Sequence, residues 1–405
     1  MNVRRSAAVL AAVAVIGAAT PAAATPSPSA SEAFPSALYG DKDPRYDGVW
    51  RQSLALLAQH TVGVKSAARS VEWLVRQQCA DGSFAPYRPD PTTACDAKTM
   101  VDTNQTAAAV QALTALGGHD AVTGKAVTWL KSVQNKDGGW GYTPGGASDT
   151  NSTSVVIGAL TAAGEKLEQV EKGGKSPYDA LLTLALGCDG DGAGAFAFQP
   201  DKKGKLAANA DATAAGVLGA LGKGMVVKPG EKSEAAKGQA CEGKNEKTPE
   251  QAAADGAGYL AKALAKDGHL TSPTPGSDPQ PDYGNTADAV VALAAHGDTG
   301  QAAKSLRWLE KNSAPWAAQN GPAAYAQLIF AAHATGTNPR DFGGTDLVKR
   351  LNATGPAPQS AGKTRAADEK SDSGVFGVWW YVGVCLVAGV GIGFLFSGRR
   401  KKHQL

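Results

Sequence analysis

A helix start of one particular form occurs several times along this chain. The stretch "DTNQTAAAVQAL" begins at Asp102, and "DTNSTSVVIGAL" begins at Asp149. Aligned on the second threonine, two further copies follow, "NADATAAGVLGAL" from Asn209 and "DYGNTADAVVAL" from Asp282. A fifth, weaker copy, in which tyrosine replaces the threonine, begins at Gly321. Internal repetition of this kind predicts one helical unit used many times, with a core that forms only when neighbouring units stack.

A second repeated motif alternates along the chain with the repeated helix start. It reads "VEWLVRQQCADGSF" at Val71–Phe84 and "VTWLKSVQNKDGGW" at Val127–Trp140, an apolar helix stripe followed by Asp-Gly and an aromatic residue. Apolar periodicity and stop signals predict about twelve helices, or six hairpins. The expected helices are Gly48–Gln59, Val64–Gln78, Thr103–Leu116, Ala121–Val133, Thr150–Ala163, Pro177–Leu186, Ala210–Leu221, Pro249–Ala265, Thr286–Ala295, Ala302–Lys311, Pro322–Thr335 and Gly344–Asn352.

The two kinds of helix differ in side-chain size. Helices rich in Ala and Gly alternate with helices that carry Trp-Leu or Tyr-Leu. Small side chains let neighbouring backbones approach closely, so we expect the Ala-rich helices to form an inner ring and the bulkier ones an outer ring. No strand-like alternation competes, and the expected fold class is all-α. Polar inserts interrupt the hairpins at Ala85–Met100, Gly222–Thr248 and Leu270–Pro281, the second being expected as a surface loop held by its cysteine.

The two ends predict export and anchoring. Residues 1–24 have the basic start, apolar run and small residues of a signal peptide. Residues 375–396 are apolar, uncharged and long enough to cross a bilayer, and the basic tail 397–405 that follows is typical of the cytoplasmic side. The Pro/Ala/Ser-rich segment 353–374 is expected to be a flexible stalk. The body would thus be extracellular, and a net charge of +3 gives no reason to expect a nucleic-acid partner.

Cysteine usage agrees with an exported body. Besides Cys385 in the apolar C-terminal run, the chain has Cys79, Cys95, Cys188 and Cys241, which allow three pairings. Joining the nearer partners, Cys79 to Cys95 and Cys188 to Cys241, would fix two long loops. Unpaired thiols are the alternative, which an oxidising compartment disfavours.

These motifs resemble a known superfamily. The Gln-Asp-Gly-aromatic elements at Gln77–Phe84 and Gln134–Gly141 are similar to the repeat of terpenoid cyclases and protein prenyltransferases, and the likeness covers about Asp43–Asn352. The resemblance implies an α/α toroid of six concentric helical hairpins. The Asp-Thr-x-x-Thr helix starts are similar to one branch of it, the cobalamin-binding domain of intrinsic factor and transcobalamin.

The repeated helix starts have two roles to consider. Asp or Asn before a helix is a standard N-cap, whose loss costs about 1 kcal/mol. In a toroid the same positions would also surround one mouth of the barrel and could hold a ligand with many amide groups. The predicted ligand-binding residues are Asp102, Asn104, Asp149, Asn151, Asn209, Asp211, Asp282 and Asn285, with Tyr87 and Tyr142 as aromatic contacts and Phe198, Tyr283 and Trp316 as further aromatic candidates.

The enzyme branches of the superfamily have acid or zinc-ligand motifs that this sequence lacks. Squalene-type cyclases protonate an alkene with an Asp-x-Asp-Asp cluster, whereas "CDGDGAG" at Cys188–Gly194 is typical of a turn. Prenyltransferases hold zinc with Asp, Cys and His, but the corresponding segment Pro200–Gly216 contains neither Cys nor His. We therefore predict no catalytic and no metal-binding residues.

The sequence thus predicts a membrane-anchored surface protein that captures a small amphipathic ligand at the toroid mouth. The resemblance makes a corrinoid the expected ligand, as cargo and not as cofactor, with a membrane importer as the possible partner that receives it. Two alternatives stay open: a terpenoid cyclase- or prenyltransferase-like enzyme with a divergent site, and a scaffold that docks proteins at the cell surface.

Overall fold

A computed structural model describes residues 36–230, 241, 248–272 and 279–360. The predicted signal peptide 1–24, membrane helix 375–396 and basic tail 397–405 lie outside these residues. Within the part of the chain that the model describes, no helix is both long enough and apolar enough to cross a membrane.

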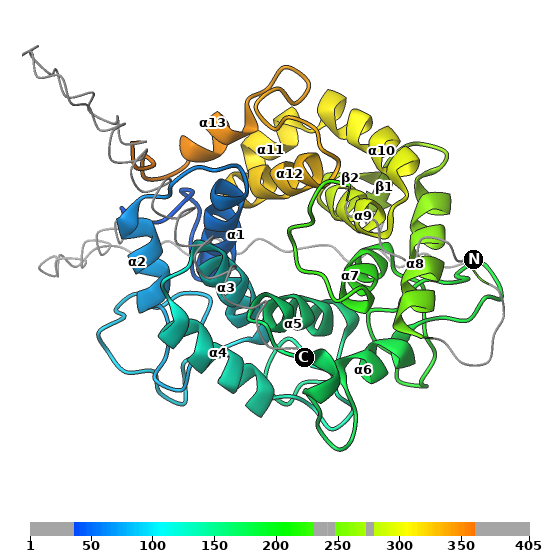
Figure 1. The fold of residues 1–405 in the computed structure, drawn as a ribbon, viewed down its shortest axis with the longest axis horizontal. Helices are drawn as coiled ribbons and strands as arrows, with labels where there is room; N and C mark the ends of the chain where they lie inside the picture. The colour runs from blue at the N-terminus through cyan, green and yellow to red at the C-terminus, as the bar shows by residue number, and fades with distance from the viewer. Residues whose placement is uncertain (1–35, 231–240, 242–247, 273–278, 361–405) are drawn as a thin grey trace, which may run out of the picture. The chain divides into compact units, whose positions relative to one another are not determined.

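Six helices form a closed inner ring (Figure 1). Each packs against the next inner helix along the chain, and the last one returns to the first. The predicted toroid is therefore confirmed, because contact between the first and last repeats is what closes a ring. The inner helices are α1 (Gly48–Thr61), α3 (Thr103–Leu116), α5 (Thr150–Ala162), α7 (Ala210–Ala220), α9 (Tyr283–His296) and α12 (Pro322–Ala334).

Six further helices surround this ring, each packed against the inner helix that precedes it in the chain. The expected division by size is confirmed, since the Trp-Leu and Tyr-Leu helices all lie outside. Small residues in the inner ring are fully buried, as at Ala107–Ala109 of α3, where larger side chains would hold the backbones apart. The outer helices are α2 (Ala68–Arg76), α4 (Asp120–Ser132), α6 (Pro177–Leu184), α8 (Pro249–Leu264), α10 (Thr299–Asn312) and α13 (Leu347–Asn352).

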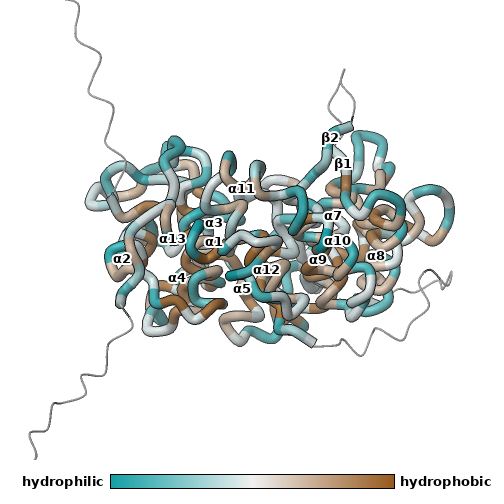
Figure 2. Tube along the Cα trace, turned by 90° about the horizontal axis from the view of Figure 1, so that it is seen from above, coloured by the Kyte–Doolittle hydropathy of each residue, from teal (hydrophilic) through white to brown (hydrophobic). Residues whose placement is uncertain are grey.

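Three small elements were not expected from the sequence. A short helix, α11 (Ala314–Asn320), precedes α12, and a 3-10 turn occupies Leu167–Gln169. The insert before α9 contains an antiparallel pair, β1 (Leu270–Ser272) and β2 (Gln280–Asp282), so the all-α expectation needs this correction. Figure 2 shows α11 and the β1–β2 pair on the same side of the ring, where α12 and α9 begin.

Hydrogen bonds explain the threonine that lies four residues after the cap in each of the four repeated helix starts. Its hydroxyl oxygen accepts a bond from the backbone N–H of a buried residue in the loop before the helix. Since a buried N–H without a partner costs about 1–3 kcal/mol, each hydroxyl ties its loop to its inner helix. The pairs are Thr106 with Phe84 at 3.0 Å, Thr153 with Trp140 at 3.1 Å, Thr213 with Phe196 at 2.9 Å and Thr286 with Leu270 at 3.0 Å.

The Asp-Gly-aromatic line forms the turn that leads from an outer helix back to the inner ring. In one copy the Asp137 carboxylate accepts from the N–H of Gly139 at 3.0 Å, and Gly138 has a positive φ of 88°. The aromatic residue that follows, Trp140, is 1% exposed, and its indole N–H donates to the Leu130 carbonyl at 2.7 Å. The turn thus places a large side chain between adjacent hairpins.

Both predicted disulfides are present: Cys79 is bonded to Cys95 and Cys188 to Cys241. The first closes the loop after α2. The second joins the loop after α6 to the long insert that precedes α8, so it links two successive outer segments of the ring.

Residues on both sides of the repeats complete the seam between α12 and α1. The N–H of Gly40 donates to the Thr354 carbonyl at 2.7 Å, and the N–H of Gln359 donates to the Lys65 carbonyl at 2.9 Å. The Tyr39 ring is fully buried there. Residues 354–359 therefore pack against the toroid, although the sequence predicted a stalk from residue 353.

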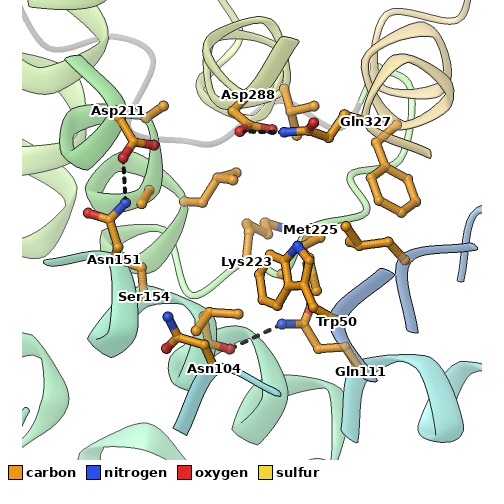
Figure 3. A pocket seen from close by; sticks show the side chains of 18 residues that line it. Trp50, Asn104, Gln111, Asn151, Ser154, Asp211, Lys223, Met225, Asp288 and Gln327 are labelled. Carbon is orange, nitrogen blue, oxygen red and sulfur yellow. Dashed lines mark hydrogen bonds between the residues drawn. The ribbon is translucent and has the colours of Figure 1, made fainter. Parts of the chain in front are cut away.

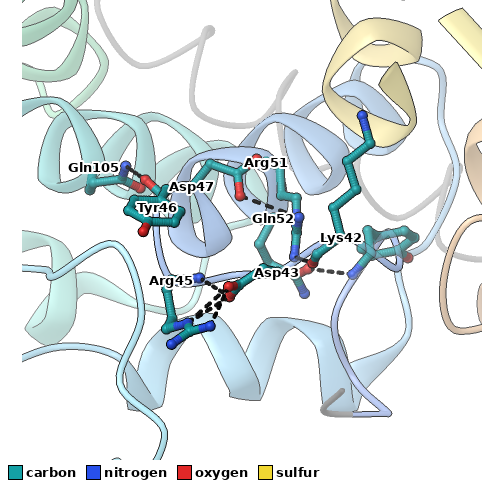
Figure 4. A network of polar contacts seen from close by, with 9 residues as sticks. Lys42, Asp43, Arg45, Tyr46, Asp47, Arg51, Gln52 and Gln105 are labelled. Carbon is teal, nitrogen blue, oxygen red and sulfur yellow. Dashed lines mark hydrogen bonds and ion pairs between the residues drawn. The ribbon is translucent and has the colours of Figure 1, made fainter. Parts of the chain in front are cut away.

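A polar network fixes the segment before α1 (Figure 4). The buried Arg51 guanidinium donates to the Lys42 carbonyl at 2.6 Å and pairs with Asp47 at 3.2 Å. The Gln52 side chain accepts from the N–H of Tyr39 at 2.9 Å. This network holds the approach to the first inner helix at the end of the ring where all the inner helices begin.

Candidate functional site

The inner ring encloses a cavity of about 260 Å³. Its wall follows one stripe on each inner helix, made by residues that lie three, four or seven positions apart, which are the spacings of one helix face. Apolar and polar side chains share this wall. The apolar lining includes Trp50, Leu54, Val155, Leu218, Met225, Val291 and Phe330; the polar lining is Asn104, Gln111, Asn151, Ser154, Asp211, Lys223, Asp288 and Gln327.

A loop after α7 forms the floor of the cavity. Lys223, Gly224 and Met225 belong to its lining, and the N–H of Met225 donates to the Gln111 side chain at 3.0 Å. Gly224 passes so close to α5 that a Cβ placed on Gly158 would lie 2.8 Å from its Cα. The expectation that Gly222–Thr248 forms a surface loop is thus wrong for its first residues. They pack inside the ring because α5 has glycine at this point of its inner stripe.

Four predicted site residues act as helix caps. Each side-chain oxygen accepts from the backbone N–H three residues ahead, which satisfies an N–H that the helix itself cannot. The carboxylates and the amide are therefore engaged with their own helices. The bonds are Asp102 to Gln105 and Asp149 to Ser152, both at 2.7 Å, Asn209 to Ala212 at 2.9 Å, and Asp282 to Asn285 at 3.1 Å.

The residues two positions after the first three of these caps line the cavity. They are Asn104, Asn151 and Asp211, at matching points of α3, α5 and α7. Asn285 instead donates from its side-chain amide to the Asp282 carboxylate at 2.8 Å and is not part of the lining.

The two predicted aromatic contacts lie outside the lining. Tyr87 stacks on Trp73 of α2, with ring centroids 6.4 Å apart, and so belongs to the outer layer. Tyr142 is 49% exposed, and its carbonyl accepts from the N–H of Thr103 at the start of α3. Only Tyr142 therefore lies next to the mouth of the cavity.

The exposed large apolar side chains of the described residues all border this mouth. Met100 and Tyr46 precede the starts of α3 and α1, and the Tyr46 carbonyl accepts from the Gln105 side chain at 3.4 Å. The Phe198 carbonyl accepts from the N–H of Thr150 at the start of α5. Together with Tyr142 they give the mouth an apolar rim.

Sequence reasoning missed Asp288 and Gln327, which face each other across α9 and α12. The Gln327 amide donates to the Asp288 carboxylate at 3.0 Å, and the Asn151 amide donates to the Asp211 carboxylate at 2.8 Å (Figure 3). A signal for Asp288 exists in the repeats: six residues after the cap, the other three copies have Ala108, Val155 and Ala215. Asp288 is thus the acidic residue at a position where the other copies are apolar.

Burial changes the acidity of the cavity carboxyls. Burial, followed by repulsion from Asp211, raises the pKa of Asp288 to about 7. Burial likewise raises the pKa of Asp211, against the opposing hydrogen bond from Asn151. At the mouth, burial raises the pKa of the Asp102 cap to about 6. The cavity therefore holds two carboxyls, one of which is protonated in about half of the molecules at neutral pH.

This arrangement predicts a pH dependence of stability. An unfolded aspartate titrates near 3.8, so between about pH 4 and 7 the folded chain binds more protons at Asp288 than the unfolded chain does. The free energy of unfolding contributed by this group therefore falls as the pH rises through that window. Relative to wild type, Asp288→Asn should gain on the order of 2 kcal/mol between pH 5 and pH 8, after allowance for water in the cavity. Urea denaturation at both pH values measures this difference.

A matched variant, Asp201→Asn, should show the opposite pH dependence of stability. The exposed Asp201 accepts backbone N–H bonds from Lys205 and Lys203, which lower its pKa. Asp201→Asn should thus lose stability relative to wild type as the pH rises through the acid range. Parallel curves for wild type and Asp288→Asn would show that the Asp288 carboxyl is not perturbed.

One grouping of potential metal ligands occurs in the described residues, formed by Cys188, Cys241 and Asp255. Its two sulfur atoms are bonded to each other as a disulfide. Since the thiolate is the form that ligates metals, this grouping serves the disulfide and not a metal ion.

Comparison with known proteins agrees with the ring geometry. A family model, the prenyltransferase alpha-alpha toroid domain, matches residues 50–184, which run from α1 to the end of α6 and so cover the first three hairpins. The chain folds as an α/α toroid and is similar to this family over its first three hairpins. No curated protein sequence matches this toroid.

Several solved structures are similar to the toroid. One is the ent-copalyl diphosphate synthase from Streptomyces platensis, with a TM-score of 0.46 and 15% identity over 71% of this chain and 50% of the synthase. The toroid thus spans half of the synthase. Another is a wild-type glycosidase, with a TM-score of 0.41 and 14% identity over 72% of this chain and 86% of the glycosidase. The cobalamin-binding branch stays a prediction from sequence.

Proposed function

We propose that this toroid is a binding protein that holds a small amphipathic molecule in its central cavity. The observation that carries the proposal is a set of buried oxygen atoms without hydrogen-bond partners in the described residues: Oδ1 of Asn104, Oδ1 of Asn151 and Oγ of Ser154, all on residues that line the cavity. An unsatisfied buried polar atom costs about 1–3 kcal/mol, which a ligand with hydrogen-bond donors would recover. The Asn104 amide forms no side-chain bond with the described residues, so it is free to turn toward such a ligand.

The rest of the cavity supports an amphipathic ligand. Trp50, Leu54 and Phe330 supply apolar surface in the same lining as the amides and carboxylates. The volume of about 260 Å³ lies just below the roughly 300–1,000 Å³ usual for small-molecule sites. The floor loop closes the far end, so the ligand would enter and leave by the mouth, across the apolar rim.

The expected ligand from the family resemblance is a corrinoid. Its ring is wider than the cavity, so a peripheral amide arm would enter while the ring lay over the rim of Tyr46, Tyr142 and Phe198. In this proposal the chain is exported, anchored by residues 375–396 and paired with a membrane importer. The two disulfides support export, because they persist in oxidising compartments.

Isothermal titration of the full-length chain with cyanocobalamin and with cobinamide tests the proposal. We expect one ligand per chain and at least a tenfold loss of affinity in Asn104→Ala, which removes a lining amide without removing a cap. The control is Asn338→Ala, an exposed asparagine in the loop after α12. Absence of heat with both corrinoids at millimolar concentration would exclude that ligand class, and equal affinities in both variants would exclude the cavity as the site.

A second candidate function is favoured by the carboxyl pair. A carboxyl with a pKa of about 7 beside a second carboxyl is suited to donate a proton to a substrate. In deuterated water, an acid-catalysed cyclisation of a prenyl substrate would place deuterium in the product. Such a product with wild type, and none with Asp288→Asn, would favour the divergent enzyme over the binding protein.

A further inference from the structure

Two carboxylates face the cavity from adjacent inner helices, Asp211 from α7 and Asp288 from α9. Each receives one hydrogen bond from a neutral amide, that of Asn151 or Gln327, on a single oxygen. Neither forms an ion pair with Lys or Arg in the described residues. The cavity therefore contains acidic groups with neutral partners only, which is an expensive arrangement for a partly apolar space.

The opposite wall is aromatic. Figure 3 shows Asp211 and Asp288 on one side of the cavity and the Trp50 indole on the other. Phe330 of α12 and Met225 of the floor also belong to the lining. Aromatic faces attract a cation that lies over them, by about 0.5–2 kcal/mol depending on how far the cation is removed from water.

A further group supports occupancy of this cavity. Ser154 is 5% exposed and lines the cavity, and its hydroxyl oxygen has no hydrogen-bond partner. With Oδ1 of Asn104 and of Asn151, it adds hydrogen-bond acceptors to a lining that already contains the two acids. Lys223 in the floor loop is the basic residue of the lining, so acceptors and negative charge dominate the wall.

From this arrangement we propose that the cavity selects a cationic ligand, an amine whose ammonium group lies between Asp211 and Asp288 and whose apolar body packs on Trp50 and Phe330. The inference rests on the proposed binding function and names the class of ligand. An ammonium group can donate hydrogen bonds to both acids, and its positive charge offsets one of their two negative charges. A neutral molecule of the same shape leaves that charge uncompensated, and an anion is repelled.

The test compares three probes of similar shape on the full-length chain at pH 8: 2-phenylethylamine, 2-phenylethanol and phenylacetate. We expect the amine to bind at least tenfold more tightly than the alcohol in isothermal titration, with no binding of phenylacetate. The preference for the amine should weaken as salt is raised, because salt screens the attraction between the charges. Asp211→Asn and Asp288→Asn should each reduce the preference to less than threefold, while Asn338→Ala keeps it.

The outcomes separate this inference from the proposed function. Equal binding of amine and alcohol would overturn the cation preference and leave a cavity that binds small molecules. Binding of a corrinoid but of none of the three probes would overturn it in the same way. If the amine binds and both variants keep their preference, the ammonium lies elsewhere. If no probe and no corrinoid binds at millimolar concentration, the binding function itself fails. The wild-type comparison needs no variant, so it stands even if one variant unfolds.

Discussion

Replacing Trp140 by alanine is expected to lower the free energy of unfolding by about 4 kcal/mol. The side chain is 1% exposed, and it packs in the core between adjacent hairpins. Its loss opens a cavity and leaves the Leu130 carbonyl without the indole donor at 2.7 Å. Large-to-small substitutions at such positions cost more than the lost transfer energy, because the surroundings close only partly around the gap. Urea denaturation followed by circular dichroism measures the change.

Two companion variants test the mechanism. Trp140→Phe keeps most of the ring volume and removes the indole bond, so we expect a smaller loss of about 1–2 kcal/mol. Tyr46→Ala removes an aromatic side chain that is 80% exposed and should change stability by less than about 0.5 kcal/mol. A loss for Trp140→Ala no larger than that for Tyr46→Ala would show that this aromatic does not hold the hairpins together.

Gly138→Ala is expected to cost about 3 kcal/mol. The residue has a φ of 88°, and a Cβ there would lie 2.1 Å from the carbonyl oxygen of Ser176. The substitution therefore adds a backbone clash to the strain of a positive φ, and Ser176 cannot move freely because it caps α6. Urea denaturation followed by circular dichroism measures this loss of stability.

Gly145→Ala is the matched control. Its φ of 77° is similar, but nothing lies within 4 Å of the added Cβ, so only the conformational strain of about 1 kcal/mol remains. The difference between the two variants isolates the close approach of the turn to α6. Equal effects in the two variants would mean that the turn and α6 are not in contact.

The fold could be predicted because its determinants are local and repeated. An Asp or Asn with a threonine four residues later specifies a cap, an inner helix and the hydroxyl that ties the preceding loop, as at Asp149 and Thr153. Asp-Gly before an aromatic specifies the return turn. Four such helix starts alternate with bulkier helices. A closed ring of hairpins buries the apolar faces of both kinds of helix. Each disulfide joins the two cysteines that are nearest in sequence. One lies in the loop after α2, and the other joins the loop after α6 to the insert before α8.

The site was predicted only in part, because it depends on contacts between distant segments. Asn104, Asn151 and Asp211 could be named from the helix starts, since position two after a cap repeats. The floor loop could not, because its place depends on a glycine, Gly158, that is unremarkable in sequence. Asp288 was hidden in a helix with the usual start. The four caps were expected to face a ligand, and each gives at least one side-chain oxygen to its own helix.

The seam between α12 and α1 has a consequence for how the chain reaches its native state. In an open solenoid, each added repeat gains stability from its neighbour alone, and shorter arrays remain folded. Here the wall of the ring is incomplete until its last helix contacts its first, and the segments around Tyr39 and Gln359 lock that contact. A chain that emerges from its amino end first would carry five hairpins with an exposed inner face until residues near 350 arrive. We expect closure to be the late, cooperative step of folding, and truncations before α12 to be degraded instead of forming smaller rings.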